Sequence, residues 1–295
     1  EENLDTLTLA PSSALGSCRR RLPASGAPDE DAVMGQLLRI LREHDIRYFF
    51  YIGGNDSMDT VAKLSAYAEA HGYEMRVIGV PKTIDNDLCE TDHTPGFGSA
   101  AKYIASSVLE IAHDTFIYAV KSVTIVEIMG RDAGWLTAAS ALARNEYNTA
   151  PHLIYLPEVP FDKDDFLLDV KRMLFERDNV IIAVSEGIRD ISGNYISASE
   201  QSVDTFGHSQ LSGAGKPLET LIAHRLGIKV RSIELNLPQR CAAHLSSLTD
   251  IEESKELGRT AVAHALKGAS GYMSIIRRES NQPYRVSYDI ADISL

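Results

Sequence analysis

Short apolar runs alternate with amphipathic segments along most of this 295-residue chain. The runs at residues 48–52, 75–80 and 123–128 are rich in aromatic and β-branched residues, as buried strands are. The intervening segments, such as residues 30–43, place apolar side chains at helical spacing. Strands that alternate with helices form mostly parallel sheets, because each helix returns the chain to the starting edge of the sheet. We therefore expect an α/β fold with doubly wound, mostly parallel sheets.

Polar loops follow the first two of these strands directly. Gly-Gly-Asn-Asp-Ser at residues 53–57 follows one strand, and Pro-Lys-Thr-Ile-Asp-Asn-Asp at residues 81–87 follows the next. Taken alone, the first loop is a turn in which Asn55, Asp56 or Ser57 caps the following helix. Taken alone, the second loop, at residues 81–87, is a solvated polar loop. Open parallel sheets bind ligands at the carboxyl ends of their strands, so both loops are candidates for one binding site.

The side chains in the two loops suit a metal and a phosphate. Lys82 offers an ammonium for phosphate oxygens, and the amide of Asn55 joins the carboxylates of Asp56, Asp85 and Asp87. Carboxylate and carbonyl oxygens are the ligands that hard cations such as Mg²⁺ prefer. Because free carboxylates repel phosphate, phosphate binding here requires a cation cofactor. The loops therefore predict a magnesium–phosphate site.

Composition restricts the other possibilities. The formal net charge of −12 argues against a nucleic-acid partner. No apolar run is long enough to span a membrane, and no signal peptide opens the chain. Cys18, Cys89 and Cys241 are widely separated and odd in number, which indicates a reducing compartment and no metal cluster. We expect a cytoplasmic protein, and because the sequence begins at Glu1 and stops at Leu295, a fragment truncated at both ends.

Three motifs together resemble the signature loops of the phosphofructokinase family: residues 53–57, residues 81–87, and Met-Gly-Arg at residues 129–131. They occur in the family's order and at about its spacing, and the resemblance covers nearly the whole chain. It implies two doubly wound α/β domains that face each other across an active-site cleft. One would comprise residues 1–98 with 239–290 and hold pyrophosphate and Mg²⁺; the other would comprise residues 99–238 with 291–295 and hold a sugar phosphate.

The resemblance also assigns roles to individual residues. Asp85 matches the catalytic base, Thr83 and Asp87 would orient it or the phosphate, and Lys82 would balance charge. The metal would be held by Asn55 and Asp56. The residues that would bind the phosphoryl donor are Gly54, Asn55, Asp56, Ser57 and Arg19. The sugar phosphate would be bound by Met129, Gly130, Arg131, Glu186, Arg231 and Arg240.

Several of these positions have a plain structural alternative. Arg19 lies in a basic stretch that reads equally as a solvated turn. Glu186 is either a turn carboxylate or an acceptor for sugar hydroxyls. Arg231 is typical of an exposed strand residue, and the sequence around it supports the binding role only through the resemblance.

Two residues resemble the pyrophosphate-dependent branch of the family. Asp56 stands where members that use ATP typically have glycine, and Lys82 stands where they typically have a small residue. A carboxylate at this place would repel a nucleotide α-phosphate, and a lysine would balance the compact charge of pyrophosphate. The resemblance thus implies a homo-oligomer (dimer or tetramer) that transfers phosphate reversibly from pyrophosphate to the 1-hydroxyl of fructose 6-phosphate, giving fructose 1,6-bisphosphate.

The sequence departs from the family pattern at four points. The given residues, which begin at Glu1, do not include the family's glycine-rich phosphate loop, which a full-length protein could supply; Asn55 stands in place of an aspartate, Ser122 (beside Lys121) in place of an arginine, and Leu237 in place of a histidine. Two alternatives therefore stay open. One is ATP as phosphoryl donor, although no Gly-x-x-x-x-Gly-Lys-[Ser/Thr] loop is present. The other is a non-catalytic, sugar-phosphate-binding or regulatory relative.

Overall fold

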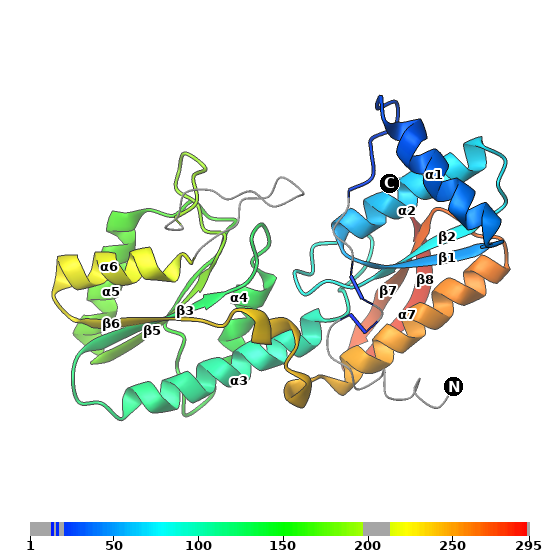
Figure 1. Ribbon diagram of the computed structural model, residues 1–295. Coiled ribbons are helices and arrows are strands. Elements are labelled where there is room, and N and C mark those ends of the chain that lie inside the picture. Colours follow the sequence, from blue (N-terminus) through cyan, green and yellow to red (C-terminus); the bar gives the residue numbers. More distant parts are fainter. Residues whose placement is uncertain (1–12, 15, 18–20, 197–212, 294–295) are drawn as a thin grey trace. The chain divides into compact units, whose positions relative to one another are not determined.

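The computed structural model describes residues 13–14, 16–17, 21–196 and 213–293. They form two compact units, which Figure 1 shows in the colours of the sequence. The inserted unit comprises Phe97–Ser247, and the few described residues up to Gly16 group with it. The outer unit comprises Ser17–Gly96 and Leu248–Leu295. The chain thus leaves the outer unit once, builds the inserted unit, and returns.

The outer unit contains a sheet of four strands in the order β1-β2-β7-β8. Strands β1, β2 and β7 are parallel, and β8 runs antiparallel to β7. In the register of β1 and β2, Gly53 lies opposite Pro81, so both strands end at the same edge. The strands are β1 (Tyr48–Gly53), β2 (Arg76–Pro81), β7 (Tyr272–Asn281) and β8 (Tyr284–Asp292).

Helices cover both faces of this sheet. Val77 of β2 packs in a core cluster with residues of α1 and α2, whereas the next residue, Ile78, packs with Ala261 and Ala265 of α7. Because successive strand residues point to opposite faces, α1 and α2 lie on one face and α7 on the other, as Figure 1 shows. The helices are α1 (Glu30–Glu43), α2 (Asn55–Ala70) and α7 (Leu248–Leu266).

The inserted unit contains a second four-stranded sheet, in the order β4-β5-β3-β6, with every pair parallel. All residues of the two central strands are buried, which explains their nearly continuous apolar sequence. The strands are β3 (Ser122–Ile128), β4 (Leu153–Tyr155), β5 (Asn179–Ser185) and β6 (Lys229–Glu234).

Helices cover both faces of the second sheet as well. Val123 and Ile125 of β3 share a core cluster with α5 and α6. Thr124, which points the other way, lies 3.5 Å (Oγ1 to Oγ1) from Thr115 of α3. The helices are α3 (Phe97–Phe116), α4 (Trp135–Ala139), α5 (Lys163–Glu176) and α6 (Gly215–Leu226), with short 3₁₀ turns η2 (Ser140–Ala143), η3 (Leu237–Arg240) and η4 (Ala243–Leu245).

The expected α/β class with mostly parallel sheets is confirmed, but some expected boundaries are wrong. Residues 291–292 belong to β8 of the outer sheet, where Ala291 pairs with Met273, and not to the second domain. Gln239 belongs to the inserted unit, because its Oε1 accepts a hydrogen bond from the Met129 N–H at 3.1 Å. The chain returns to the outer unit only after Ser247. Within the part of the chain that the structure describes, no helix is long and apolar enough to cross a membrane.

Candidate active site

The loops that follow β1 and β2 lie in contact at one edge of the outer sheet. The Lys82 N–H donates to the Gly53 carbonyl at 2.9 Å. A Cβ atom added to Gly54 would lie 3.4 Å from the Thr83 Cβ, so the two backbones approach closely. This is the arrangement expected for neighbouring parallel strands, and it brings the polar residues of both loops together.

Helix α2 begins earlier than the sequence pattern indicates. Gly54 is the N-cap residue, and its carbonyl accepts hydrogen bonds from the Ser57 and Met58 N–H groups at 3.0 Å each. The expectation that Asn55, Asp56 or Ser57 caps the helix is wrong, because no side chain makes a capping hydrogen bond. The first turn therefore keeps N–H groups without side-chain acceptors, and these attract anions.

Asn55 instead bridges the two loops. Its Nδ2 donates a hydrogen bond to Oδ2 of Asp87. Asp56 follows in the first turn of α2 and is exposed, as is Lys82 on the facing loop. Four of the candidate residues therefore sit where the carboxyl ends of two adjacent strands meet the start of a helix.

Internal hydrogen bonds shape the loop that carries Asp85 and Asp87. The Thr83 Oγ1 accepts from the Asp85 N–H at 3.1 Å. Asn86 has a left-handed backbone, with φ of 55°, and its Oδ1 accepts from the Thr94 N–H at 3.0 Å. The buried Thr94 in turn donates its hydroxyl to the Thr83 carbonyl at 2.8 Å. The loop is thus closed on itself, and Asp85 is held half-buried at its centre.

A second group of candidate residues gathers at the carboxyl ends of β3 and β5 in the inserted unit. The Gly130 N–H donates to Oε1 of Glu186 at 3.3 Å, and the Ser185 hydroxyl donates to the Gly130 carbonyl at 2.5 Å. Burial raises the pKa of Glu186, while the hydrogen bond from Gly130 and the charges of Arg131 and Arg240 act in the opposite direction. Met129, Gly130, Arg131, Glu186 and Arg240 therefore form one cluster.

Arg131 is held tightly against the end of β5. A Cβ atom on Gly187 would lie 1.8 Å from the Arg131 carbonyl oxygen, so only glycine fits there. The Nε of Arg131 is buried and has no hydrogen-bond partner among the described residues. A buried guanidinium nitrogen without a partner is costly, and a bound anion or hydroxyl would satisfy it.

Arg231 does not join this cluster within the chain. It pairs with Thr124 near the middle of β3, and its Nη1 lies 3.7 Å from Oδ2 of Asp114 at the end of α3. Its side chain is exposed. The structure thus separates Arg231 from Arg240, which the sequence analysis grouped together, and Arg19 lies outside the described residues.

Two residues near this cluster, Gln239 and Glu127, were not among the candidates predicted from the sequence. Gln239 ties η3 to Met129, and Glu127 of β3 is buried with its Oε2 accepting from the Gly215 N–H at 2.6 Å. Burial is the main reason that the pKa of Glu127 rises to about 7; the nearby charges of Glu234 and Glu186 add to it, and the hydrogen bond from Gly215 opposes it. An acidic residue inside an otherwise apolar strand was the available signal.

The chain matches known proteins over nearly its full length. The family model described as phosphofructokinase matches residues 1–233. The pyrophosphate–fructose 6-phosphate 1-phosphotransferase of Xanthomonas campestris pv. campestris is 45% identical over 281 residues, which is 95% of this chain and 67% of that protein. The enzyme of the same name from Methylococcus capsulatus is 41% identical over 99% of this chain and 70% of its own length.

Solved structures show the same relationship. The crystal structure of a pyrophosphate-dependent phosphofructokinase from Marinobacter aquaeolei superposes with a TM-score of 0.85 at 36% identity. It covers 100% of this chain, which corresponds to 68% of that protein. Together with the residue clusters at the ends of β1 and β2 and of β3 and β5, these matches show that the chain belongs to the phosphofructokinase family.

Proposed function

We propose that the protein is a phosphotransferase that moves a phosphoryl group reversibly from pyrophosphate to the 1-hydroxyl of fructose 6-phosphate. The relatives that carry this activity in their names support the proposal. The structural observation that carries it is the junction of the two loops of the outer unit, where the Asn55–Asp87 hydrogen bond brings Asp56 and Lys82 to one edge of the sheet.

The choice of phosphoryl donor follows from Asp56 and Lys82. The Lys82 ammonium is exposed and makes no ion pair or hydrogen bond within the described part of the chain, which leaves it available to phosphate oxygens. Asp56 adds a negative charge and bulk in the first turn of α2. A compact, highly charged pyrophosphate gains from the lysine, whereas the α-phosphate of ATP would meet the carboxylate. ATP is the less favoured donor for this reason.

A divalent metal accompanies this chemistry in the family, and we propose Mg²⁺. The described residues contain no group of three or more His, Cys, Asp or Glu that could hold a metal by themselves. This fits Mg²⁺, which proteins commonly hold through one or two carboxylates together with the phosphates of the substrate. Asp56 and the amide oxygen of Asn55 would hold the ion, whose charge would neutralise the phosphate oxygens.

Residues of the chain take up the proton of the attacking hydroxyl and bind the sugar phosphate that accepts the phosphoryl group. Asp85 takes the proton of the attacking 1-hydroxyl, and the ring of hydrogen bonds through Thr83 and Thr94 fixes its place. In the inserted unit, Glu186 accepts hydrogen bonds from sugar hydroxyls, and Arg131 and Arg240 bind the sugar phosphate. Arg231 is proposed as a further ligand of the 6-phosphate. Homo-oligomerisation and a cytoplasmic location stay predictions.

The test is an assay of the full-length protein with Mg²⁺, fructose 6-phosphate and either pyrophosphate or ATP. We expect fructose 1,6-bisphosphate to form with pyrophosphate and to be consumed when inorganic phosphate is supplied. Preference for ATP would refute the choice of donor. Tight binding of fructose 6-phosphate without turnover from either compound would instead favour a non-catalytic relative.

A further inference from the structure

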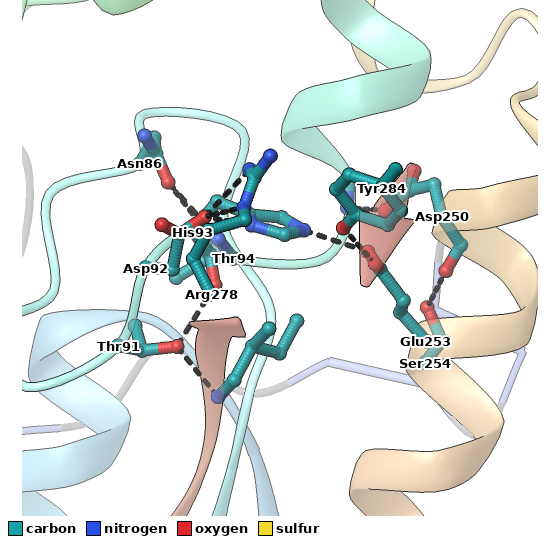
Figure 2. A network of polar contacts seen from close by, with 12 residues as sticks. Asn86, Thr91, Asp92, His93, Thr94, Asp250, Glu253, Ser254, Arg278 and Tyr284 are labelled. Atoms are coloured by element: carbon teal, nitrogen blue, oxygen red, sulfur yellow. Dashed lines mark hydrogen bonds and ion pairs between the residues drawn. The ribbon is translucent and has the colours of Figure 1, made fainter. Parts of the chain in front are cut away.

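A network of charged side chains lies at the far end of the loop that carries Asp85 and Asp87 (Figure 2). The imidazole of His93 stands between two carboxylates. Its Nδ1 lies 2.7 Å from Oδ2 of Asp92, and its Nε2 lies 2.6 Å from Oε2 of Glu253 on helix α7. Both ring nitrogens thus face anionic oxygens, and this geometry suits an imidazolium, which donates from both nitrogens.

The same network reaches the hairpin formed by β7 and β8. Arg278 of β7 donates to Oδ2 of Asp92 at 2.8 Å, and its guanidinium lies 4.5 Å from the ring centroid of Tyr284 on β8. The Tyr284 hydroxyl donates to Oε1 of Glu253. His93, Asp92, Glu253, Arg278 and Tyr284 are hereafter called the His93 network, and they come from the loop, α7, β7 and β8.

The charges in the network balance only when His93 is protonated. Asp92 and Glu253 contribute two negative charges, and Arg278 contributes one positive charge. Burial lowers the pKa of His93, but the hydrogen bonds with Glu253 and Asp92 outweigh it and raise the pKa above its usual value. If His93 loses its proton, Glu253, whose side chain is only 4% exposed, keeps the Tyr284 hydroxyl and the nearby charge of Arg278 but loses its directly paired cation. A buried carboxylate without a cationic partner is unfavourable.

Backbone contacts connect the network to the candidate catalytic residues. The Asp92 N–H donates to the Ile276 carbonyl and the Ile276 N–H to the Thr91 hydroxyl, which pins this end of the loop to β7. The residue after His93 is Thr94, whose hydrogen bonds to Thr83 and Asn86 hold the part of the loop that contains Asp85. Figure 2 labels Asn86, Thr91, Asp92, His93 and Thr94 along this connection. The charged network and the contacts that hold the Asp85 loop therefore involve consecutive residues, His93 and Thr94.

We infer that His93 is a positioning residue of the transfer reaction: as an imidazolium it fastens the loop that carries Asp85 and Asp87 to helix α7 and to the β7–β8 hairpin, so that turnover depends on its proton. This inference rests on the proposed function, because it concerns the placement of the proposed base. No contact between His93 and a substrate is involved. The established motif of the family stops at Asp87, and His93 follows it by six positions.

The first test uses His93→Gln, which keeps a hydrogen-bonding side chain but cannot carry the charge. We expect kcat to fall roughly tenfold while KM for both substrates stays within about twofold, because the base is misplaced and the binding groups are not. His44→Gln is the matched control, since His44 is an exposed histidine of the same unit, at the end of α1. Wild-type kcat in a folded His93→Gln variant would overturn the inference.

The second test follows the proton. The His93 resonance in NMR spectra of the wild type, assigned by through-bond correlation to its own backbone amide, gives its pKa, and we expect the loss of kcat at high pH to have the same midpoint. Glu253→Gln removes one of the two carboxylates and should move both midpoints to lower pH by the same amount. If the His93 midpoint moves and the kcat midpoint does not, the inference is wrong. This comparison does not require His93→Gln to fold.

A third measurement separates the inference from the proposed function. Amide hydrogen exchange in residues 82–96 should accelerate as pH rises through the His93 midpoint, beyond the intrinsic effect of pH, and this extra acceleration should be absent in His93→Gln. If the wild-type protein turned over neither pyrophosphate nor ATP, the proposed function would fail while the exchange result still reported on the loop. Unchanged exchange would refute the fastening itself.

Discussion

The side-chain amide of Asn55 donates a hydrogen bond to Oδ2 of Asp87 and so joins two loops that are 32 residues apart in the sequence. The resemblance to the phosphofructokinase pattern implies an aspartate where this chain has Asn55. With an amide there, Asp87 faces a hydrogen-bond donor and not a second carboxylate, so this contact is favourable without a metal. The substitution thus shifts part of the support for the junction from a cation to the protein itself.

Asn55→Asp should therefore make the junction depend on the metal. A carboxylate opposite Asp87 would lower the free energy of unfolding by about 1 kcal/mol in metal-free buffer, and Mg²⁺ should restore part of it. Thermal unfolding with EDTA and with Mg²⁺ measures both effects. Asn55→Ala is the control, because it removes the hydrogen bond without adding charge and should respond less to Mg²⁺. Equal responses of the two variants would contradict the prediction.

Asp85→Asn should lower kcat by roughly a hundredfold or more, because an amide cannot accept the proton of the sugar hydroxyl. Asparagine preserves the shape of the side chain, and the hydrogen bond from the N–H of residue 85 to the Thr83 hydroxyl is retained. KM for fructose 6-phosphate should change little. Steady-state kinetics in both reaction directions provide the measurement, and nearly normal turnover would remove Asp85 from the mechanism.

Arg240→Ala should raise KM for the sugar phosphate roughly tenfold or more, since a guanidinium next to Glu186 is lost from the binding cluster. Arg231→Ala should also raise this KM if its guanidinium serves the 6-phosphate, as the resemblance implies. The ion pair of Arg231 with Asp114 offers a separate comparison. If Asp114→Asn and Arg231→Ala change only stability and leave KM as it is, Arg231 is a structural residue of the strand.

Glu127 should make the inserted unit less stable as pH rises. Its pKa is raised from 4.5 to about 7 in the folded state, so the folded protein retains a proton that the unfolded chain releases. The contribution to stability is complete below about pH 4.5 and is lost as pH rises to about 7. Its full size is on the order of 3 kcal/mol, at 1.36 kcal/mol per unit of pKa.

Glu127→Gln mimics the protonated form and should abolish this loss. Urea unfolding at about pH 5 and about pH 8 should show the variant gaining stability relative to the wild type as pH increases. Glu234→Gln is a useful second variant, because the charge of Glu234 helps to raise the pKa of Glu127. It should weaken the pH dependence without abolishing it. The same pH dependence in all three proteins would exclude Glu127 as its source.

Helices and strands were predictable from the sequence where the spacing of apolar residues indicates one type of secondary structure. The amphipathic pattern at residues 30–43 matches α1 (Glu30–Glu43), and the apolar run at residues 123–128 falls within β3. By contrast, the helical segment that follows β3 is divided into α4 and η2. The Ala143 carbonyl, which a longer helix would use, accepts the side-chain amide of Asn148 at 2.7 Å. Such a local competitor for a backbone group leaves no trace in the periodicity.

The candidate site was predictable only where residues follow a strand. Lys82, Asp85 and Asp87 were found because they come directly after β2, and adjacent parallel strands end together. The pairing of His93 with Glu253 spans 160 residues and crosses the whole inserted unit in sequence, so no local pattern indicates it. The separation of Arg231 from Arg240 depends likewise on strand register, which a single sequence does not determine.

The sharpest prediction concerns the phosphoryl donor. Asp56→Gly removes the charge and the bulk that would oppose an ATP α-phosphate at the start of α2, so we expect the variant to gain ATP-dependent activity. Lys82→Gly removes an exposed cation and should depress the use of pyrophosphate. The resulting change in donor preference should amount to several kcal/mol, on the order of what like charges cost when they face each other in an interface.

Steady-state kinetics of the wild type and both variants with each donor decide the matter. Because the two residues lie on adjacent loops, the double variant should show whether they act on one phosphate: effects that fail to add indicate a shared contact. Lys63→Gly is an unsuitable control, because Lys63 forms an ion pair with Asp59 inside α2. Lys102→Gly is the control, because Lys102 lies on α3 of the inserted unit and belongs to neither loop. If neither Asp56→Gly nor Lys82→Gly alters donor preference while the wild type uses pyrophosphate, specificity comes from residues outside these loops.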